Sequence, residues 1–121
     1  VLIEVFNKFR KQVHGLVHCS GGAQTKVLHF VDKLHIIKDN LLPTPPLFKL
    51  IQQQSGTDWK EMYKVFNMGH RMEIYLEEKY AEEVIAISRS FEINAKIIGH
   101  VETSAEKQVT IKSENGEFIY N

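Results

Sequence analysis

Two short stretches of the chain hold residue types that can bind a negatively charged group. The first stretch, residues 14–26, places Ser20, Gly21 and Gly22 between strand-like residues and the start of a helix. Backbone N–H groups at such a junction lack a partner within the helix and can donate to an anion. A tight turn without further function explains a Gly-Gly pair equally well. Lys26 lies one turn further on and can add positive charge, although a solvated lysine is the commoner outcome.

The second stretch, residues 65–72, contains Asn67, Gly69 and Arg71. Asn67 and Gly69 favour a turn before the next strand. In a functional interpretation, Asn67 presents its amide to a polar ligand and Arg71 binds a phosphate or carboxylate. The residues alone leave both interpretations open. We expect this stretch to face the first one across a cleft.

Other kinds of site have weaker support in the sequence. Neither the Gly-x4-Gly-Lys-Ser/Thr spacing of a P-loop nor the Gly-x-Gly-x-x-Gly spacing of a dinucleotide site occurs. His18 stands where a serine nucleophile elbow at Ser20 would need glycine, so a hydrolase is disfavoured. The six histidines and the single cysteine show no recognisable zinc spacing. Scattered structural histidines and a small, buried Cys19 are favoured over a metal site.

Size and composition limit the classes of protein. A chain of 121 residues with 43% hydrophobic and 25% charged residues is typical of one globular domain. Fifteen basic and fifteen acidic side chains cancel, so we expect no nucleic-acid partner. The apolar runs are too short for a membrane span, and one cysteine suits the reducing cytoplasm. The sequence opens at Val1 inside a helical pattern, so we expect a fragment of a longer protein.

The elements that must position these residues follow from hydrophobic periodicity. The pattern predicts helices at residues 1–13, 23–31, 46–54, 58–66 and 77–91 and strands at 14–19, 35–38, 72–76, 95–101, 108–112 and 118–120. Their alternation predicts an α/β fold with helices packed on a sheet.

Several details of these elements can be tested. Apolar residues on both faces of residues 14–19 predict an inner strand with cover on each side. Pro46 suits the first position of a helix that Gly56 ends, and the apolar residues 47, 50 and 51 should form its buried stripe. Thr57 or Asp58 can cap the next helix, and Glu61 stands at capping-box distance from Asp58. Asn115 and Gly116 predict a two-residue hairpin turn. In the 77–91 helix, the expected core stripe ends at Phe91.

Three sequence blocks carry a resemblance to a known family. They are VHGLVHCSGGA (13–23), WKEMYKVFNMGHRM (59–72) and AKIIGHV (95–101). Their order and spacing resemble the C-terminal domain of the phosphoribosylformylglycinamidine cyclo-ligase family, the aminoimidazole ribonucleotide synthetases. Two positions depart from the family pattern: Ala23 replaces the third glycine of the first block, and Arg71 replaces the second glycine of the Asn67 motif.

The resemblance implies a mixed sheet in a three-layer α/β/α arrangement, as one C-terminal domain over residues 1–121. It implies an enzyme of de novo purine biosynthesis that uses ATP and magnesium to close an imidazole ring. In this family an N-terminal domain carries most of the ATP and magnesium chemistry. We therefore expect no cofactor in this chain and no activity from it alone. The implied partners are a ribonucleotide substrate, the protein's own N-terminal domain and a second copy in a homodimer.

The substrate-binding residues that we expect, from the two stretches and the resemblance together, are His18, Ser20, Gly21, Gly22, Asn67, Gly69 and Arg71. No residue is assigned a catalytic or metal-binding role. Two alternatives stay open. One is another ATP-using member of the superfamily, similar to selenophosphate synthetase or formylglycinamide ribonucleotide amidotransferase. The other is a non-catalytic ligand-binding module, which the departures at Ala23 and Arg71 keep open.

Overall fold

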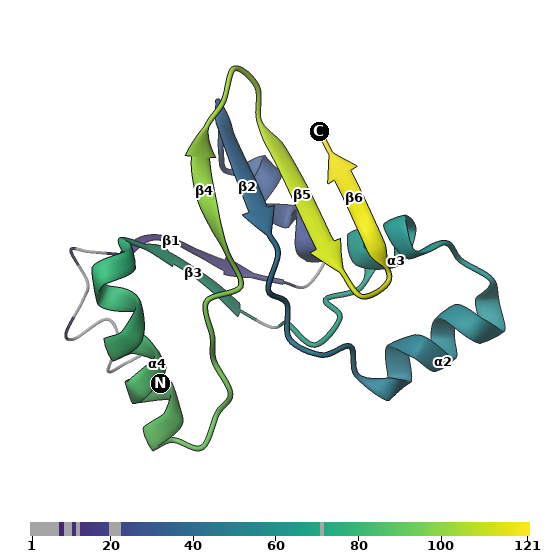
Figure 1. Cartoon of the computed structure of the whole chain (residues 1–121), viewed down its shortest axis with the longest axis horizontal. Helices are drawn as coiled ribbons and strands as arrows, with labels where there is room; N and C mark the ends of the chain where they lie inside the picture. Colours follow the sequence, from purple (N-terminus) through teal and green to yellow (C-terminus); the bar gives the residue numbers. More distant parts are fainter. Residues whose placement is uncertain (1–7, 9–10, 12, 20–22, 71) are drawn as a thin grey trace. The chain divides into compact units, whose positions relative to one another are not determined.

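The computed structural model describes residues 8, 11, 13–19, 23–70 and 72–121. The chain divides into two compact units, of which the smaller combines residues 1–17 and 72–97 and the larger combines residues 18–71 and 98–121. Figure 1 labels their helices and strands. The helix predicted at 1–13 falls mostly outside the described residues. The single domain expected over the whole chain stays a prediction.

The smaller unit contains a two-stranded sheet in which β1 (Val13–His18) pairs with β3 (Met72–Leu76). Both strands are confirmed where the sequence predicts them. Burial alternates along β1, so that Val17 is buried and the three even-numbered residues are exposed. This pattern is typical of a strand with cover on one face. The expected cover on both faces is wrong, because the packing helix residue Val84 lies on the face that carries Val13.

A short 3-10 turn, η2 (Glu78–Tyr80), leads into the helix α4 (Ala81–Ser90). The helix predicted at 77–91 is confirmed in position but is divided into these two elements. Val84 is buried, and partly buried apolar residues of β1, β3, η2 and α4 pack against it. Phe91, which we expected in the buried stripe, is 47% exposed because α4 ends one residue earlier.

The larger unit is built on a four-stranded mixed sheet with the strand order β4-β2-β5-β6 (Figure 1). In that order the strands span Gly99–Thr103, Leu34–Lys38, Gln108–Ser113 and Gly116–Tyr120. β2 is antiparallel to β4 and parallel to β5, while β5 and β6 are antiparallel. The predicted α/β fold with a mixed sheet is confirmed.

The strand predicted at 95–101 is displaced toward the C-terminus. Its pairing with β2 begins where Gly99 faces Lys38 and ends where Thr103 faces Leu34. Next to this pairing, the Ile98 carbonyl oxygen accepts the N–H groups of Asp39 and Asn40, which follow β2 in the sequence. The position of a strand depends on its neighbour as much as on its own apolar residues.

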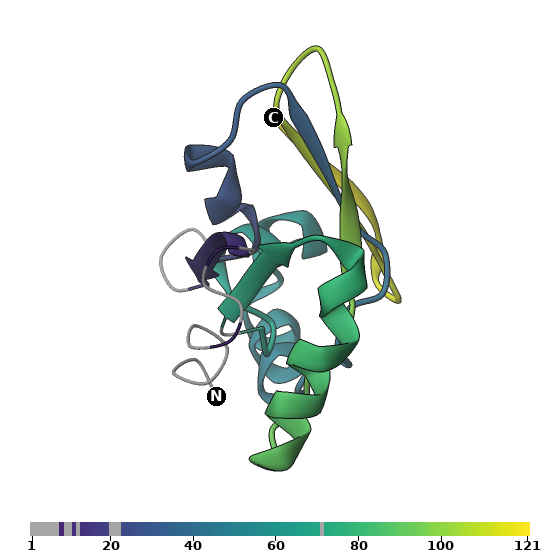
Figure 2. The ribbon, with the colours of Figure 1, turned by 90° about the vertical axis from the view of Figure 1, so that its left-hand side faces the viewer.

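The described helices of the larger unit are η1 (Ala23–His29), α2 (Pro46–Ser55) and α3 (Trp59–Val65). η1 contacts both α3 and β5, and Figures 1 and 2 show η1 and α3 on the same side of the sheet. The buried apolar side chains of this unit are Cys19, Val27, Leu28, Ile36, Met62, Tyr63, Met68, Val109, Ile111 and Tyr120. In the described part of the chain, no helix is long and apolar enough to cross a membrane.

The ends of α2 are confirmed, but its predicted buried face is wrong. Pro46 opens the helix, and Gly56 ends it in a left-handed conformation with its N–H donated to the carbonyl oxygen of Gln52. Leu47 and Leu50 are 60% and 52% exposed. The helix instead contacts the protein through Phe48, whose ring centroid lies 5.8 Å from that of Phe66.

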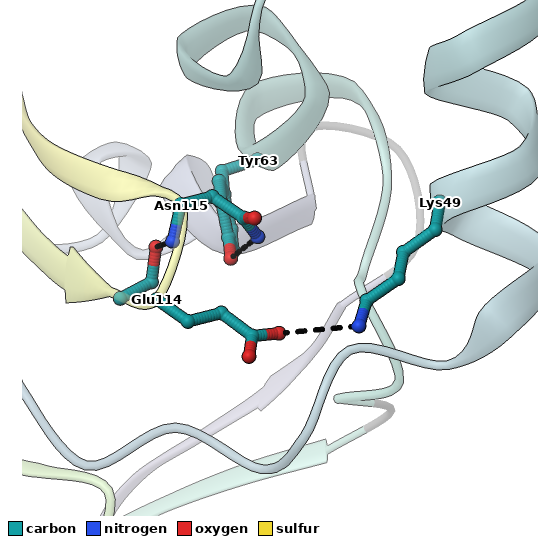
Figure 3. A network of polar contacts seen from close by, with 5 residues as sticks. Lys49, Tyr63, Glu114 and Asn115 are labelled. Carbon is teal, nitrogen blue, oxygen red and sulfur yellow. Dashed lines mark hydrogen bonds and ion pairs between the residues drawn. The ribbon is translucent and has the colours of Figure 1, made fainter.

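The C-terminal hairpin forms as predicted, with its turn one residue earlier. Ser113 pairs with Gly116, so Glu114 and Asn115 form the turn. Asn115 Nδ2 donates to the hydroxyl of Tyr63 at 3.2 Å, and the Glu114 carboxylate lies 3.8 Å from Lys49 Nζ; Figure 3 shows both contacts. The hairpin turn is therefore tied to α3 through Tyr63.

Candidate functional site

Three of the seven predicted binding residues lie among the described residues: His18, Asn67 and Gly69. The other four, Ser20, Gly21, Gly22 and Arg71, lie outside the described residues. The described part of the candidate site consists of the end of β1, the Asn67 turn and the helix η1 that follows the glycine pair.

His18 ends β1 with an exposed side chain, and its carbonyl oxygen accepts a hydrogen bond from Lys26 Nζ at 3.0 Å. Lys26 therefore folds back from η1 onto the strand end rather than extending into solvent alone. This contact places the positive charge of Lys26 beside the backbone of His18. Cys19 itself is 1% exposed, which confirms the predicted burial of its small side chain.

The turn at residues 67–69 is confirmed, and Gly69 is required in it. Met68 and Gly69 both adopt positive φ angles, of 55° and 94°. A Cβ atom on Gly69 would lie 2.9 Å from Cγ of Pro45, closer than ordinary packing allows. A left-handed backbone and the close proline thus select glycine at this position.

Asn67 supplies acceptors to the turn from two of its atoms. Its side-chain Oδ1 accepts the N–H of Gly69 at 2.9 Å, and its carbonyl oxygen accepts the N–H of His70 at 2.9 Å. The bond from a backbone N–H fixes which end of the amide is the oxygen. Within the described residues, the half-buried Asn67 keeps its Nδ2 group as a donor with no protein acceptor.

A buried polar chain reaches the same turn from η1 and β2. The Gln24 side chain is fully buried, and its Nε2 donates to the Asn67 carbonyl oxygen at 2.8 Å. Lys38, 1% exposed in β2, donates from Nζ to the Gln24 carbonyl oxygen at 2.7 Å and to Gln24 Oε1 at 2.9 Å. The network thus joins η1, the Asn67 turn and the stretch from β2 into the loop of residues 39–45, because His70 extends it to that loop.

His70 links the turn to that loop, residues 39–45. The backbone N–H of Leu42 donates to His70 Nε2 at 3.2 Å. A backbone N–H can only donate, so this nitrogen of the buried ring is unprotonated and the proton of a neutral ring is on Nδ1. Pro45, at the end of the loop, contacts the turn at Gly69. The loop is therefore held against the Asn67 turn from two points.

A comparison with protein families identifies the class of domain. The model of the family described as AIR synthase related protein, C-terminal domain, matches residues 1–112. The chain belongs to this family. The resemblance found in the three sequence blocks is thereby confirmed.

Curated relatives of this AIR synthase related domain are named phosphoribosylformylglycinamidine cyclo-ligase. The protein from Methanococcus vannielii is 34% identical over 112 residues, which make up 93% of this chain and 32% of that protein. The protein from Methanocaldococcus jannaschii is 37% identical over 95 residues, covering 78% and 27% of the two chains. The chain thus spans about a third of the length of the curated relatives it matches.

Two members of the polar network in this AIR synthase related domain escaped the sequence analysis. The sequence places Gln24 in the predicted helix 23–31 and Lys38 at the end of the predicted strand 35–38, and it marks neither as part of a site. A signal was present for Lys38, because strand alternation places it on the same face as the buried Ile36. No comparable signal marks Gln24, whose neighbours Lys26 and Thr25 are also polar.

Proposed function

We propose that this chain is the substrate-binding domain of an ATP-dependent phosphoribosylformylglycinamidine cyclo-ligase. The reaction closes the imidazole ring of aminoimidazole ribonucleotide during purine biosynthesis. Family membership and the names of the relatives support this proposal. In the full enzyme, ATP with magnesium activates the formyl oxygen of the substrate, and an N-terminal domain binds most of both. That enzyme is a cytoplasmic homodimer in this proposal.

The proposed role of this chain is to hold the ribonucleotide. Backbone N–H groups and the hydroxyl of Ser20, Gly21 and Gly22 bind its phosphate, as the family motif implies. His18 and Arg71 add polar contacts beside it, and Gly69 gives the Asn67 turn its shape. The described part of the chain has no group of three His, Cys, Asp or Glu side chains that could hold a metal ion.

The observation that carries the proposal is the state of the Asn67 amide. Its oxygen is engaged by Gly69, so the group that it can offer a ligand is the NH2 donor. Such a donor suits the phosphate, hydroxyl and carbonyl oxygens of a ribonucleotide. It sits on a turn held by a buried network, and a preorganised donor binds with a smaller entropy cost.

Isothermal titration of this chain tests the proposal. We expect aminoimidazole ribonucleotide to bind, and ATP with magnesium to bind far more weakly or not at all. Inorganic phosphate at matched ionic strength is the control for the phosphate contribution alone. Failure of the ribonucleotide to bind would contradict the assignment of its site to this chain. Tight binding of ATP would contradict the proposed division between the two domains.

A further inference from the structure

Lys38 and Gln24 form a buried polar pair in the middle of the larger unit. Their side chains are 1% and 0% exposed, and Lys38 Nζ contacts both oxygens of Gln24 at 2.7 and 2.9 Å. Burying an ammonium group costs more than burying apolar atoms of the same size. Buried polar pairs of this kind can often be replaced by apolar residues without loss of stability. Packing alone therefore gives no reason for a lysine at this position.

Lys38 fixes the orientation of the Gln24 amide. An ammonium group only donates, so it selects the Gln24 rotamer in which Oε1 faces Lys38. The opposite end of the same amide, Nε2, then faces the Asn67 carbonyl oxygen and donates to it at 2.8 Å. A Gln24 amide turned by 180° would place its oxygen against another oxygen. The lysine thus determines which group reaches the Asn67 turn.

The Asn67 carbonyl oxygen receives two donors, one from Gln24 Nε2 and one from the N–H of His70. The His70 bond lies within the turn, which His70 and Gly69 also hold against the loop of residues 39–45. The Gln24 bond comes from η1, 43 residues away in the sequence, and ties the turn to a further segment. The Gly69 bond orients the Asn67 amide on this turn, and Lys38 connects the turn to the sheet through Gln24.

We infer that Lys38 and Gln24 are positioning residues that aim the Asn67 NH2 donor at an oxygen of the bound ribonucleotide. This inference rests on the proposed function, in which Asn67 contacts that ligand. The pair acts through Asn67 and contacts no ligand itself.

Gln24→Glu is the most selective test, because it keeps the bond that Gln24 accepts from Lys38 and removes the bond that it donates to Asn67. The carboxylate keeps both the size of the side chain and an acceptor for Lys38, but it has no N–H for the Asn67 carbonyl oxygen. We expect the affinity for aminoimidazole ribonucleotide to fall about tenfold. We expect hydrogen exchange at the N–H groups of Gly69 and His70 to become about tenfold faster than in the unsubstituted chain. The melting temperature should fall as well, because the second carboxylate oxygen then faces the Asn67 carbonyl oxygen.

Two further variants separate positioning from stability. Lys38→Met alone leaves the Gln24 oxygens without this donor and is expected to lower stability. The double variant Lys38→Met/Gln24→Leu removes both polar side chains of the pair, so it should be more stable than Lys38→Met alone while ribonucleotide affinity stays low. Lys107→Met is the matched control. Lys107 also donates to a carbonyl oxygen of η1, that of Leu28 at 3.2 Å, but has no link to the Asn67 turn.

The readouts distinguish failure of this inference from failure of the proposed function. Unchanged exchange at Gly69 and His70 in Gln24→Glu would overturn the positioning role, whether or not any ligand binds. Faster exchange with unchanged ribonucleotide affinity would overturn the link between positioning and binding. Faster exchange in a chain whose unsubstituted form binds no ribonucleotide would support the positioning and contradict the proposed function. Recovery of full affinity in the double variant would also overturn the inference.

Discussion

Two asparagine turns of the larger unit use the same side chain in opposite ways. At the hairpin turn, Asn115 donates its Nδ2 group to the hydroxyl of Tyr63, so the amide nitrogen is engaged by the protein (Figure 3). At the other turn, Asn67 engages its oxygen with Gly69 and keeps the NH2 group as a donor. The sequence marks both positions as turns. The hydrogen-bond partner of each amide separates a structural turn from one that can bind a ligand.

The glycines of the two turns should differ most in their tolerance of substitution. Gly69→Ala should lower the free energy of unfolding by about 2–4 kcal/mol, because the residue has a positive φ and its added Cβ meets the rigid ring of Pro45. Gly116→Ala should cost less, about 1–3 kcal/mol, because Gly116 also has a positive φ but its added Cβ meets the movable end of the Phe118 ring. Urea denaturation measures both. Equal losses would mean that Pro45 yields as easily as Phe118.

The second expected effect concerns the partner of Asn115. Tyr63→Phe removes the hydroxyl that accepts from Asn115 Nδ2 and should lower stability by about 1 kcal/mol. Ribonucleotide affinity should not change, because this bond lies outside the Asn67 network. Denaturation and titration of the same sample measure both quantities. A loss of affinity would show that the two turns are coupled.

A third effect concerns how the stability of the larger unit, which contains the hairpin, depends on alkaline pH. Burial raises the pKa of Tyr120 in β6 above its ordinary value of 10.0. Below pH 10.0 the phenol is neutral in the folded and the unfolded chain, and its contribution to stability is fully present. As the pH rises further, the unfolded chain loses the proton first, so stability falls. Tyr120→Phe should therefore show a shallower alkaline loss in thermal melts, and an unchanged slope would contradict the burial of this group.

The smallest effect is expected from the ion pair beside the hairpin. Lys49 and Glu114 are 3.8 Å apart, and their side chains are 50% and 57% exposed. Exposed pairs of this kind contribute little, so Lys49→Met should change stability by less than about 0.5 kcal/mol. Thermal melts at low and high salt provide the measurement. A larger loss that disappears in salt would show that the pair holds the turn more firmly than its exposure suggests.

Local chemistry made the element ends predictable from the sequence. Pro46 marks the start of α2 because its ring fixes a helical φ, and Gly56 marks the end because glycine tolerates the left-handed conformation found there. Asp58 caps α3 by accepting the N–H of Glu61, as its spacing predicts. The turn at Gly69 also followed from residue type alone.

Features that depend on distant neighbours were not predictable in this way. Leu50 has the spacing of a core residue, yet it is 52% exposed, and no residue of α2 is buried. The strand predicted from residue 95 begins at Gly99 because β2 ends opposite it. The contact between Gln24 and Asn67 joins residues 43 apart, and no periodicity encodes such a pairing.

The most direct test of the account compares Asn67→Asp with Asn115→Asp in a titration with aminoimidazole ribonucleotide. Each substitution keeps an oxygen acceptor and removes the NH2 donor. The Asn67 variant therefore retains its bond from Gly69. The account predicts an affinity loss of about tenfold or more for Asn67→Asp and no loss for Asn115→Asp. Equal affinities in both variants would contradict the claim that Asn67 presents its amide to the ligand.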